Sequence, residues 1–130
     1  MTLQLVHSKE APPAIGPYSH AVIGAGLIFV SGQLPLDPAT QAIVAGTAVD
    51  QLKAALANAA QVLAAGGASL SDVVKTTVFL TDLSVFDAVN KAYAEIFAGH
   101  APARSVVEVS RLPRGAAVEV ELIAVAGAGR

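Results

Sequence analysis

The sequence predicts a single α+β domain in which two helices cover one face of a β-sheet. Two segments carry apolar residues at the three- and four-residue spacing of amphipathic helices, and five others are β-branched or alternate as strands do. The predicted order is strand, strand, helix, strand, helix, strand, strand. A chain of 130 residues is long enough to bury one core without disulfides. Because the sequence has no internal repeat and no long linker, we expect one domain over residues 1–130.

The first two predicted strands form a hairpin. Residues 19–23 and 27–32 are largely apolar, and the sequence between them, Gly24-Ala25-Gly26, is typical of a tight turn. The second strand ends in Ser31 and Gly32. A hydroxyl and an unhindered glycine N–H at this position can bind a small polar group, so both are candidate site residues.

The first predicted helix begins at Thr47, where Asp50 three residues on completes a capping-box pattern, and it ends at Gly66-Gly67. Apolar residues at three- and four-residue steps form one stripe along this helix. Such a stripe packs on a sheet and leaves the opposite side of the helix to solvent. Its apolar residues are Val49, Leu52, Leu56, Ala59, Ala60 and Leu63.

The third predicted strand, residues 73–81, is β-branched and largely apolar on both faces. The second helix is predicted to begin at Ser84, with Asp87 three residues on, and to end near Gly99. Residues 105–109 and 118–125 are the last two strands. Because two helices cover only one face of such a sheet, we expect a neighbouring subunit on the other.

The composition excludes several classes of protein. Hydrophobic residues make up 54% of the chain and charged residues 14%, the net charge is −2, and there is no cysteine. These values exclude a disordered tail, a disulfide scaffold, thiol catalysis and a basic arm, so we expect no nucleic-acid partner. Prolines and glycines interrupt the uncharged run over residues 11–36, and the first ten residues lack the layout of a signal peptide. We therefore expect a cytoplasmic protein without membrane association.

Two charged residues are candidates for chemistry. Arg104 follows Pro102 at the entrance to a strand, where its planar guanidinium can hold a carboxylate through two parallel hydrogen bonds. The alternative is an ion pair with Glu108 or Glu121. Glu119, on the polar side of the last strand, can hold and activate a water molecule, and its alternative is a solvated glutamate on an exposed face.

The three histidines, His7, His20 and His100, are far apart in the chain and lack the spacing of metal ligands, so we expect no metal site. A surface or turn position is the alternative interpretation for each. Only His20, just after the turn at Gly16-Pro17-Tyr18, is a candidate for lining a site.

Several short motifs also follow one another along the chain. They are IGPYS (15–19), VSGQLP (30–35), VKTTVFL (74–80), VNxxY (89–93), PARS (102–105), EVxxLPxG (108–115) and VEVE (118–121). This series resembles the RidA family (reactive intermediate deaminase A, also called the YjgF family). The resemblance extends over residues 3–127, and the number of motifs at the right spacing makes it specific.

The resemblance implies a chorismate-mutase-like α+β fold, with one mixed sheet covered by two helices, and a homotrimer formed through the other sheet face. It implies sites between subunits that hydrolyse 2-iminopropanoate, 2-iminobutanoate and their enamine tautomers to 2-oxo acids and ammonia. No cofactor and no metal is implied, and the ligands are small 2-imino and 2-oxo carboxylates.

By the same resemblance, Arg104 binds the substrate carboxylate, and Glu119 orients the water and transfers protons to the departing ammonia. The other substrate-binding positions implied are Tyr18, Ser31, Gly32, Asn90 and Val106, with Gly32 and Val106 acting through their backbone. The chain departs from the family pattern where Val106 replaces a frequent cysteine, His20 a frequent glutamine and Ala101 a frequent phenylalanine.

Two other functions fit the sequence. Some members of the family are described as ribonucleases or translation inhibitors, so an RNA-acting protein is the first alternative. The eight basic residues are scattered, however, and only Arg104, Arg111 and Arg114 lie close together in the chain. The second alternative is a catalytically silent trimer that binds a small carboxylate or a protein partner. The presence of both Arg104 and Glu119 favours hydrolysis.

Overall fold

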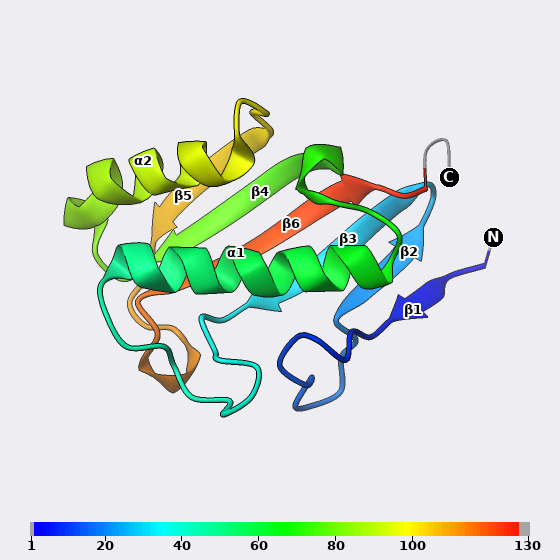
Figure 1. Cartoon of the computed structure of the whole chain (residues 1–130), viewed down its shortest axis with the longest axis horizontal. Coiled ribbons are helices and arrows are strands. Elements are labelled where there is room, and N and C mark those ends of the chain that lie inside the picture. The colour runs from blue at the N-terminus through cyan, green and yellow to red at the C-terminus, as the bar shows by residue number, and fades with distance from the viewer. Residues whose placement is uncertain (1, 128–130) are drawn as a thin grey trace.

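A computed structural model describes residues 2–127 (Figure 1). Six strands form one sheet in the order β1-β2-β3-β6-β4-β5, and two helices pack on one of its faces. The strands are β1 Gln4–Val6, β2 Ala21–Gly24, β3 Leu27–Gln33, β4 Val73–Leu80, β5 Ala103–Glu108 and β6 Val118–Val125. The helices are α1 Ala48–Ala65 and α2 Phe86–Phe97, and the 3₁₀ turns are η1 Leu70–Asp72, η2 Leu83–Val85 and η3 Pro113–Gly115.

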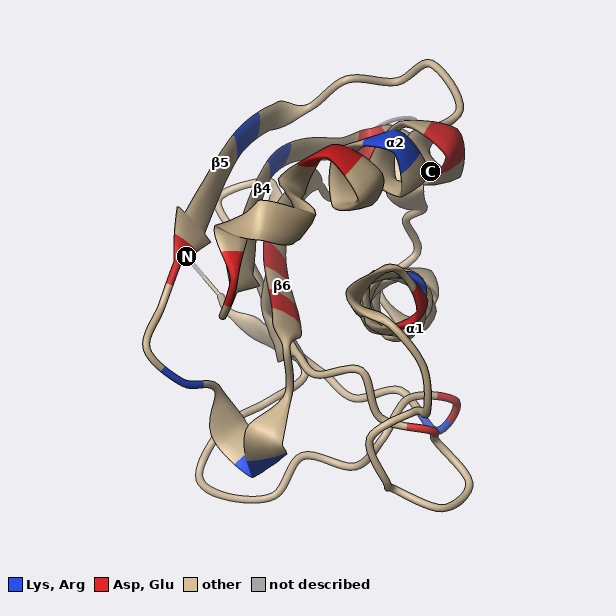
Figure 2. Cartoon of the chain, turned by 90° about the vertical axis from the view of Figure 1, so that its left-hand side faces the viewer, with Lys and Arg blue, Asp and Glu red and all other residues tan. Residues whose placement is uncertain are grey.

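The arrangement of the layers confirms the predicted α+β fold. β4 and β5 run parallel, and the other neighbouring strands run antiparallel, so the sheet is mixed. Figure 2, in which α1 is seen end on, shows both helices on the same side of the sheet. The predicted helices and strands match the observed ones to within two residues at each end. Neither helix of residues 2–127 combines the length and the apolar composition needed to cross a bilayer.

The edge strand β1 is an element that the sequence did not predict. It has only three residues, too few to display an alternating pattern, and it pairs with β2 from Gln4↔Ile23 to Val6↔Ala21. It leads into the loop over residues 7–20, which returns to β2 and forms one wall of the site described below.

Hydrogen bonds at the helix ends explain where the helices begin. The Thr47 side chain accepts from Asp50 N, and the Asp50 carboxylate accepts from Thr47 N at 2.8 Å, which confirms the predicted capping box. The second helix begins at Phe86, two residues after its predicted start at Ser84. Ser84 lies inside the turn η2, where its own N–H needs an acceptor, and the Asp82 side chain supplies one at 2.8 Å.

The core lies between the helices and the sheet. Along β6, Val118, Val120 and Leu122 are buried under the helices, while Glu119 and Glu121 alternate with them and face the other way. The residues that α1 buries against the sheet include small ones, which allow the helix to approach closely. They are Leu52, Ala55, Leu56, Ala59, Val62 and Leu63.

The opposite face of the sheet, called the open face here, carries no described helix and is rich in apolar side chains. The strand register places Leu5, Val22, Phe29 and Ile123 in one row across β1, β2, β3 and β6. Leu5 is 63% exposed and Phe29 46% exposed. Exposed apolar patches of this kind mark interaction surfaces. The subunit expected to cover this face stays a prediction.

Candidate functional site

An irregularity in β3 creates the first candidate cleft. The pairing of β3 with β6 is regular from Leu27 to Val30 and shifts before Gln33, so Ser31 and Gly32 lie where the ladder is irregular. Bulges re-aim side chains and backbone groups, and they are frequent beside active sites. The structure therefore places the predicted Ser-Gly pair at a bulge within the strand.

The Glu119 carboxylate lies directly against Gly32. A Cβ atom added to Gly32 would lie 2.7 Å from Oε2 of Glu119, closer than Cβ atoms approach other atoms in proteins, and 3.0 Å from its Cδ. Gly32 is not among the glycines with a left-handed backbone. A side chain at Gly32 would therefore force the Glu119 carboxylate out of its present position.

The hollow around this carboxylate, the Glu119 cleft, has a volume of about 590 Å³. It brings together four of the predicted site residues, Tyr18, Ser31, Gly32 and Glu119. The Ser31 hydroxyl donates to Ser19 O at 2.7 Å, so its oxygen keeps lone pairs that can accept from a ligand. Tyr18 is 49% exposed and stands at the wall of the cleft.

Burial raises the pKa of the Glu119 carboxyl above its ordinary value, and the negative charge of Glu121 raises it further. The two residues share a face because they are two positions apart on β6. A raised pKa brings a carboxyl group closer to the pH range in which it can both accept and donate a proton. Glu119 is thus half-buried at the cleft, and the alternative of a fully solvated glutamate does not describe it.

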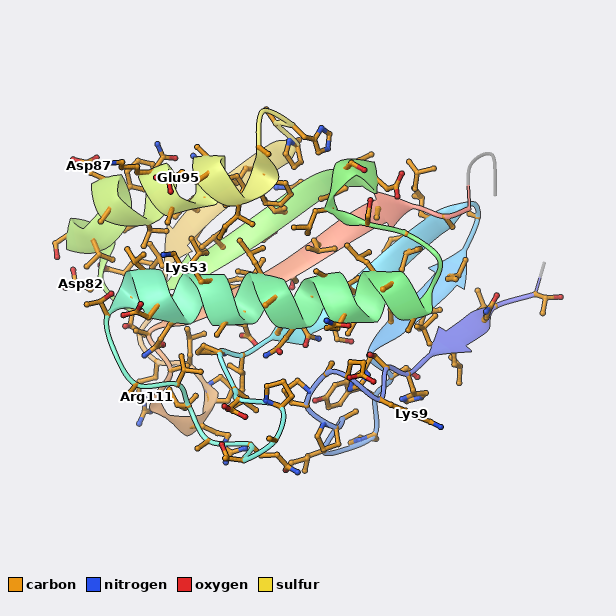
Figure 3. The ribbon with its side chains drawn as sticks, in the orientation of Figure 1. Lys9, Lys53, Asp82, Asp87, Glu95 and Arg111 are labelled. Atoms are coloured by element: carbon orange, nitrogen blue, oxygen red, sulfur yellow. The ribbon has the colours of Figure 1, made fainter. Side chains whose placement is uncertain are left out.

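We expect the substitution Glu121→Gln to lower the pKa of Glu119, because it removes one of the two causes that raise it. A titration of side-chain carboxyl carbons by NMR measures this shift. Glu95→Gln, at the exposed position labelled on α2 in Figure 3, is the matched control and should leave the Glu119 midpoint unchanged. An unchanged midpoint in Glu121→Gln would contradict the assigned electrostatic coupling.

Arg104 lies in a second hollow, the Arg104 cleft, with a volume of about 460 Å³ beside α2. Arg104 Nη1 donates to Asn90 Oδ1 at 2.8 Å, and the guanidinium carbon lies 4.8 Å from the centroid of the Tyr93 ring. The Tyr93 hydroxyl is in turn hydrogen-bonded to Thr76 Oγ1 at 2.8 Å. Two side chains of α2 therefore orient Arg104, and its other N–H groups can hold a carboxylate.

The structure does not form the ion pair considered as an alternative for Arg104. The Glu108 carboxylate instead accepts from Leu83 N at 2.9 Å. Glu121 lies on the open face, whereas Arg104 packs against α2 on the other side of the sheet. Within the described chain, the contact partners of Arg104 are thus an amide and aromatic rings.

Arg104 and Glu119 lie on opposite faces of the sheet. Arg104 is in register with Thr76, whose side chain is buried and bonded to α2. Glu119 is in register with Phe79 and faces away from the helices, because the neighbouring Val118 is fully buried beneath them. One chain thus holds its two candidate catalytic residues in separate clefts.

Val106 lies in β5, at the edge of the sheet. Val109 N donates to Leu80 O at 2.8 Å, so the backbone groups of Val107 and Val109 point towards β4. Because these directions alternate along a strand, the N–H and C=O of Val106 point away from the sheet, and its side chain packs against the core. This geometry agrees with a backbone contribution from Val106 at the β5 edge.

Contacts between distant residues at the clefts did not follow from the sequence. His20, the histidine expected to line a site, does line the Glu119 cleft. Its ring centroid lies 5.6 Å from that of His7, because β1 brings the N-terminus beside β2. The contact of Tyr93 with Arg104 depends on how α2 lies over β5, which helical spacing alone does not show. Among residues 2–127, no group of three or more His, Cys, Asp or Glu side chains is arranged to hold a metal ion.

The chain is thus a small α+β domain with an arginine at one cleft and a half-buried glutamate at another. The chain belongs to the RidA (YjgF) family: the family model described as Endoribonuclease L-PSP matches residues 8–126.

Individual relatives agree with this assignment. Protein DfrA of Myxococcus xanthus is 51% identical over 127 residues, which cover 96% of this chain and 97% of the relative. The 2-iminobutanoate/2-iminopropanoate deaminase of Mus musculus is 45% identical over 124 residues, 95% of this chain and 92% of that protein. The crystal structure of the YjgF gene product of E. coli matches with a TM-score of 0.89 at 41% identity, covering 94% of this chain and 98% of that one.

Proposed function

We propose that this protein hydrolyses 2-imino acids and their enamine tautomers to 2-oxo acids and ammonia, in sites formed between the subunits of a homotrimer. The observation that carries the proposal is the placement of Arg104 and Glu119, each oriented at a cleft but on opposite faces of one sheet. The apolar open face supplies a surface through which copies can associate. The name of the mouse relative, 2-iminobutanoate/2-iminopropanoate deaminase, supplies the reaction.

The chemistry needs a positioned water and proton transfers, because the imine carbon is already electrophilic. The substrate carboxylate binds the guanidinium of Arg104 from one subunit. Glu119 of the next subunit accepts a proton from the water as the water oxygen bonds to C2 of the substrate. The nitrogen takes up this proton to give a carbinolamine. It takes up a second proton, passed through Glu119 from the new hydroxyl group, as the C2–N bond breaks, the C2=O bond forms and ammonia leaves. One imine and one water give one 2-oxo acid and one ammonia.

The remaining candidate residues complete this site. The Ser31 oxygen and the backbone of the bulge at Gly32 surround the carboxylate of Glu119. Tyr18 closes one wall of the cleft. Val106 lies two residues after Arg104 on β5, and its outward-facing backbone would contribute from that strand. Holding the imine and the water beside the Glu119 carboxylate lowers the entropic part of the activation barrier.

One assay tests the proposed reaction. A threonine dehydratase generates 2-iminobutanoate in situ, semicarbazide traps it, and the wild-type protein is expected to divert it to 2-oxobutanoate. An inert wild-type protein that still binds 2-oxobutanoate would support the silent carboxylate-binding trimer instead. The relevant comparison is the rate of semicarbazone formation with and without the protein at equal dehydratase activity.

We expect Gly32→Ala to lower kcat strongly, because the new methyl group would occupy the place of the Glu119 carboxylate. A loss of about 10²-fold corresponds to displacing one general acid–base group. Gly66→Ala is the control, since Gly66 ends α1 outside both clefts. A Cβ atom at Gly66 would come no closer than 3.3 Å to any neighbouring atom. Full activity in Gly32→Ala would contradict the assigned position of Glu119.

We expect Asn90→Ala to raise KM about tenfold, because Arg104 loses the hydrogen bond that orients it and such a bond to a charged group contributes about 1.5–3 kcal/mol. The effect on kcat should be smaller, since Asn90 acts on the carboxylate-binding residue. Lys91→Ala, at the next exposed position of α2, is the matched control. Unchanged KM in Asn90→Ala would show that Arg104 does not depend on this contact.

An RNA-cleaving activity is the second candidate, because the matching family model carries the description Endoribonuclease L-PSP. The nearest pair of histidines, His7 and His20, is poorly suited to acid–base cleavage of RNA, since both ring nitrogens of His20 already have backbone partners. Cleavage of RNA that persists through stringent purification and is lost in His7→Phe would establish this activity.

A further inference from the structure

His20 is a buried side chain that the proposed mechanism does not use. It is 3% exposed, and its ring lines the Glu119 cleft. Ser8 N donates to His20 Nδ1 at 2.9 Å, and His20 Nε2 lies 2.7 Å from Pro12 O. Both ring nitrogens are therefore bonded to the backbone of one loop, at positions that are four residues apart.

These two bonds allow only one form of the ring. A backbone N–H can only donate, so Nδ1 must carry a lone pair, and a carbonyl oxygen can only accept, so Nε2 must carry the proton. The ring is thus the neutral Nε2–H tautomer. A doubly protonated ring would set an N–H of His20 against the N–H of Ser8, and the other neutral tautomer would break both bonds.

The contacts of His20 connect the proline-containing loop at one wall of the Glu119 cleft to the bulge of β3. Pro12 and Pro13, in the loop that the ring holds, line the cleft. The backbone of His20 also accepts from Ser31 N at 2.9 Å, and Ser31 belongs to the bulge beside Glu119. One residue therefore fixes the proline wall relative to the bulge.

Within residues 2–127, the hydrogen-bond partners of the His20 ring are backbone groups and not charged side chains. His7 is the ring nearest to it, at 5.6 Å between centroids, and Glu119 and Arg114 line the same cleft. Lys9, in the held loop, is exposed and points outward in Figure 3. The hydrogen bonds of His20 are thus all to backbone groups, and they hold the loop without using a charge.

We propose that His20, as its neutral Nε2–H tautomer, is a positioning residue that clamps the loop from Ser8 to Pro13 against the bulge of β3 and so keeps the Glu119 cleft in its substrate-binding shape. The inference deepens the proposed function and rests on it for the identity of the substrate. The clamp itself is a property of the fold and can be measured without any activity.

Three variants test the clamp. His20→Phe keeps an aromatic ring but removes both bonding nitrogens, and His20→Gln restores one acceptor and one donor on a single side chain. His7→Phe keeps the neighbouring ring contact and is the control, because His7 is exposed and lies outside both clefts. Thermal unfolding of each variant establishes that it is folded.

The first measurement needs no substrate. In the wild type, ¹⁵N NMR should show His20 as the Nε2–H tautomer, and hydrogen exchange should show a protected Ser8 amide. Loss of one net hydrogen bond corresponds to roughly tenfold faster exchange of that amide in His20→Phe, with protection restored in His20→Gln. A Ser8 amide that exchanges equally fast in the wild type and in His20→Phe would overturn the clamp, whatever the function of the protein.

The second measurement links the clamp to the cleft. We expect His20→Phe to raise KM for 2-iminobutanoate and the Kd of 2-oxobutanoate about tenfold, with kcat changed about twofold or less. His20→Gln should recover most of this loss, and His7→Phe should match the wild type. Unchanged KM and Kd in a folded His20→Phe protein whose Ser8 amide has lost protection would overturn the positioning role. A wild-type protein that neither binds nor turns over these ligands would instead overturn the proposed function.

Discussion

Arg104→Ala is expected to lower kcat/KM for 2-iminobutanoate by about 30- to 5,000-fold, because truncating one partner of a buried charge pair costs about 2–5 kcal/mol. The substituted protein would leave the substrate carboxylate without its guanidinium in a partly desolvated cleft. Most of the loss should fall on KM and on the affinity for 2-oxobutanoate, since the carboxylate is present in substrate and transition state alike. The dehydratase-coupled assay and calorimetric titration with 2-oxobutanoate measure the two quantities.

Two further variants sharpen this result. Arg104→Lys keeps the charge but loses the planar fork and the stacking on Tyr93, so we expect it to recover only a small part of the activity. Arg111→Ala is the charge-matched control, since Arg111 is exposed outside both clefts and is labelled in Figure 3. Wild-type affinity for 2-oxobutanoate in Arg104→Ala would show that the carboxylate binds elsewhere.

Glu119→Gln is expected to lower kcat by about 10²- to 10⁴-fold, the range typical of losing a general acid–base group. Glutamine keeps the size of the side chain, so the cleft against Gly32 remains filled and the affinity for 2-oxobutanoate should change little. This separation of kcat from affinity distinguishes Glu119 from Arg104. Activity close to that of the wild type would mean that another group transfers the proton.

The same substitution should stabilise the fold at neutral pH. Burial raises the pKa of Glu119 in the folded protein above its unfolded value, so ionisation opposes folding. This destabilisation is full above the folded pKa and absent below the unfolded one. The Tm of Glu119→Gln should therefore exceed that of the wild type near pH 8, and the two should coincide near pH 3.5. A lower Tm at pH 8 would contradict the burial of a charged Glu119.

Local patterns in the sequence predicted most of the fold. The capping box at Thr47, the hairpin around Gly24-Ala25-Gly26 and the alternation along β6 are signals carried by neighbouring residues, and the structure has all three. The three-residue strand β1 is too short for such a signal. The predicted start of α2 is two residues early, because Ser84 resembles a helix N-cap residue in the sequence. In the structure, the Ser84 N–H instead donates to the Asp82 side chain.

The geometry of the site depends on contacts between distant residues. The resemblance named Arg104, Glu119, Tyr18, Ser31 and Asn90, and the structure groups them into two clefts. That these clefts lie on opposite faces follows from the register of β5 and β6 with β4, which no local pattern specifies. The bonds of His20 to Ser8 and Pro12 likewise depend on how the loop folds back onto β2.

The central claim, that each site combines Arg104 of one subunit with Glu119 of another, is tested most directly by mixing subunits. Arg104→Ala and Glu119→Gln proteins are unfolded together in equal amounts and refolded, so that chains combine at random. Each inactive variant carries the residue that the other lacks. We expect about one quarter of the sites to regain both residues and the corresponding activity.

A second mixture, of wild type with the double variant Arg104→Ala/Glu119→Gln, calibrates the measurement. If the two residues come from different chains, both mixtures should show the same activity, about one quarter of the wild-type value. If they came from one chain, the first mixture would stay inactive and the second would show about one half. Equal recovery in the two mixtures is the predicted result, and an inactive first mixture whose chains have demonstrably exchanged would contradict it.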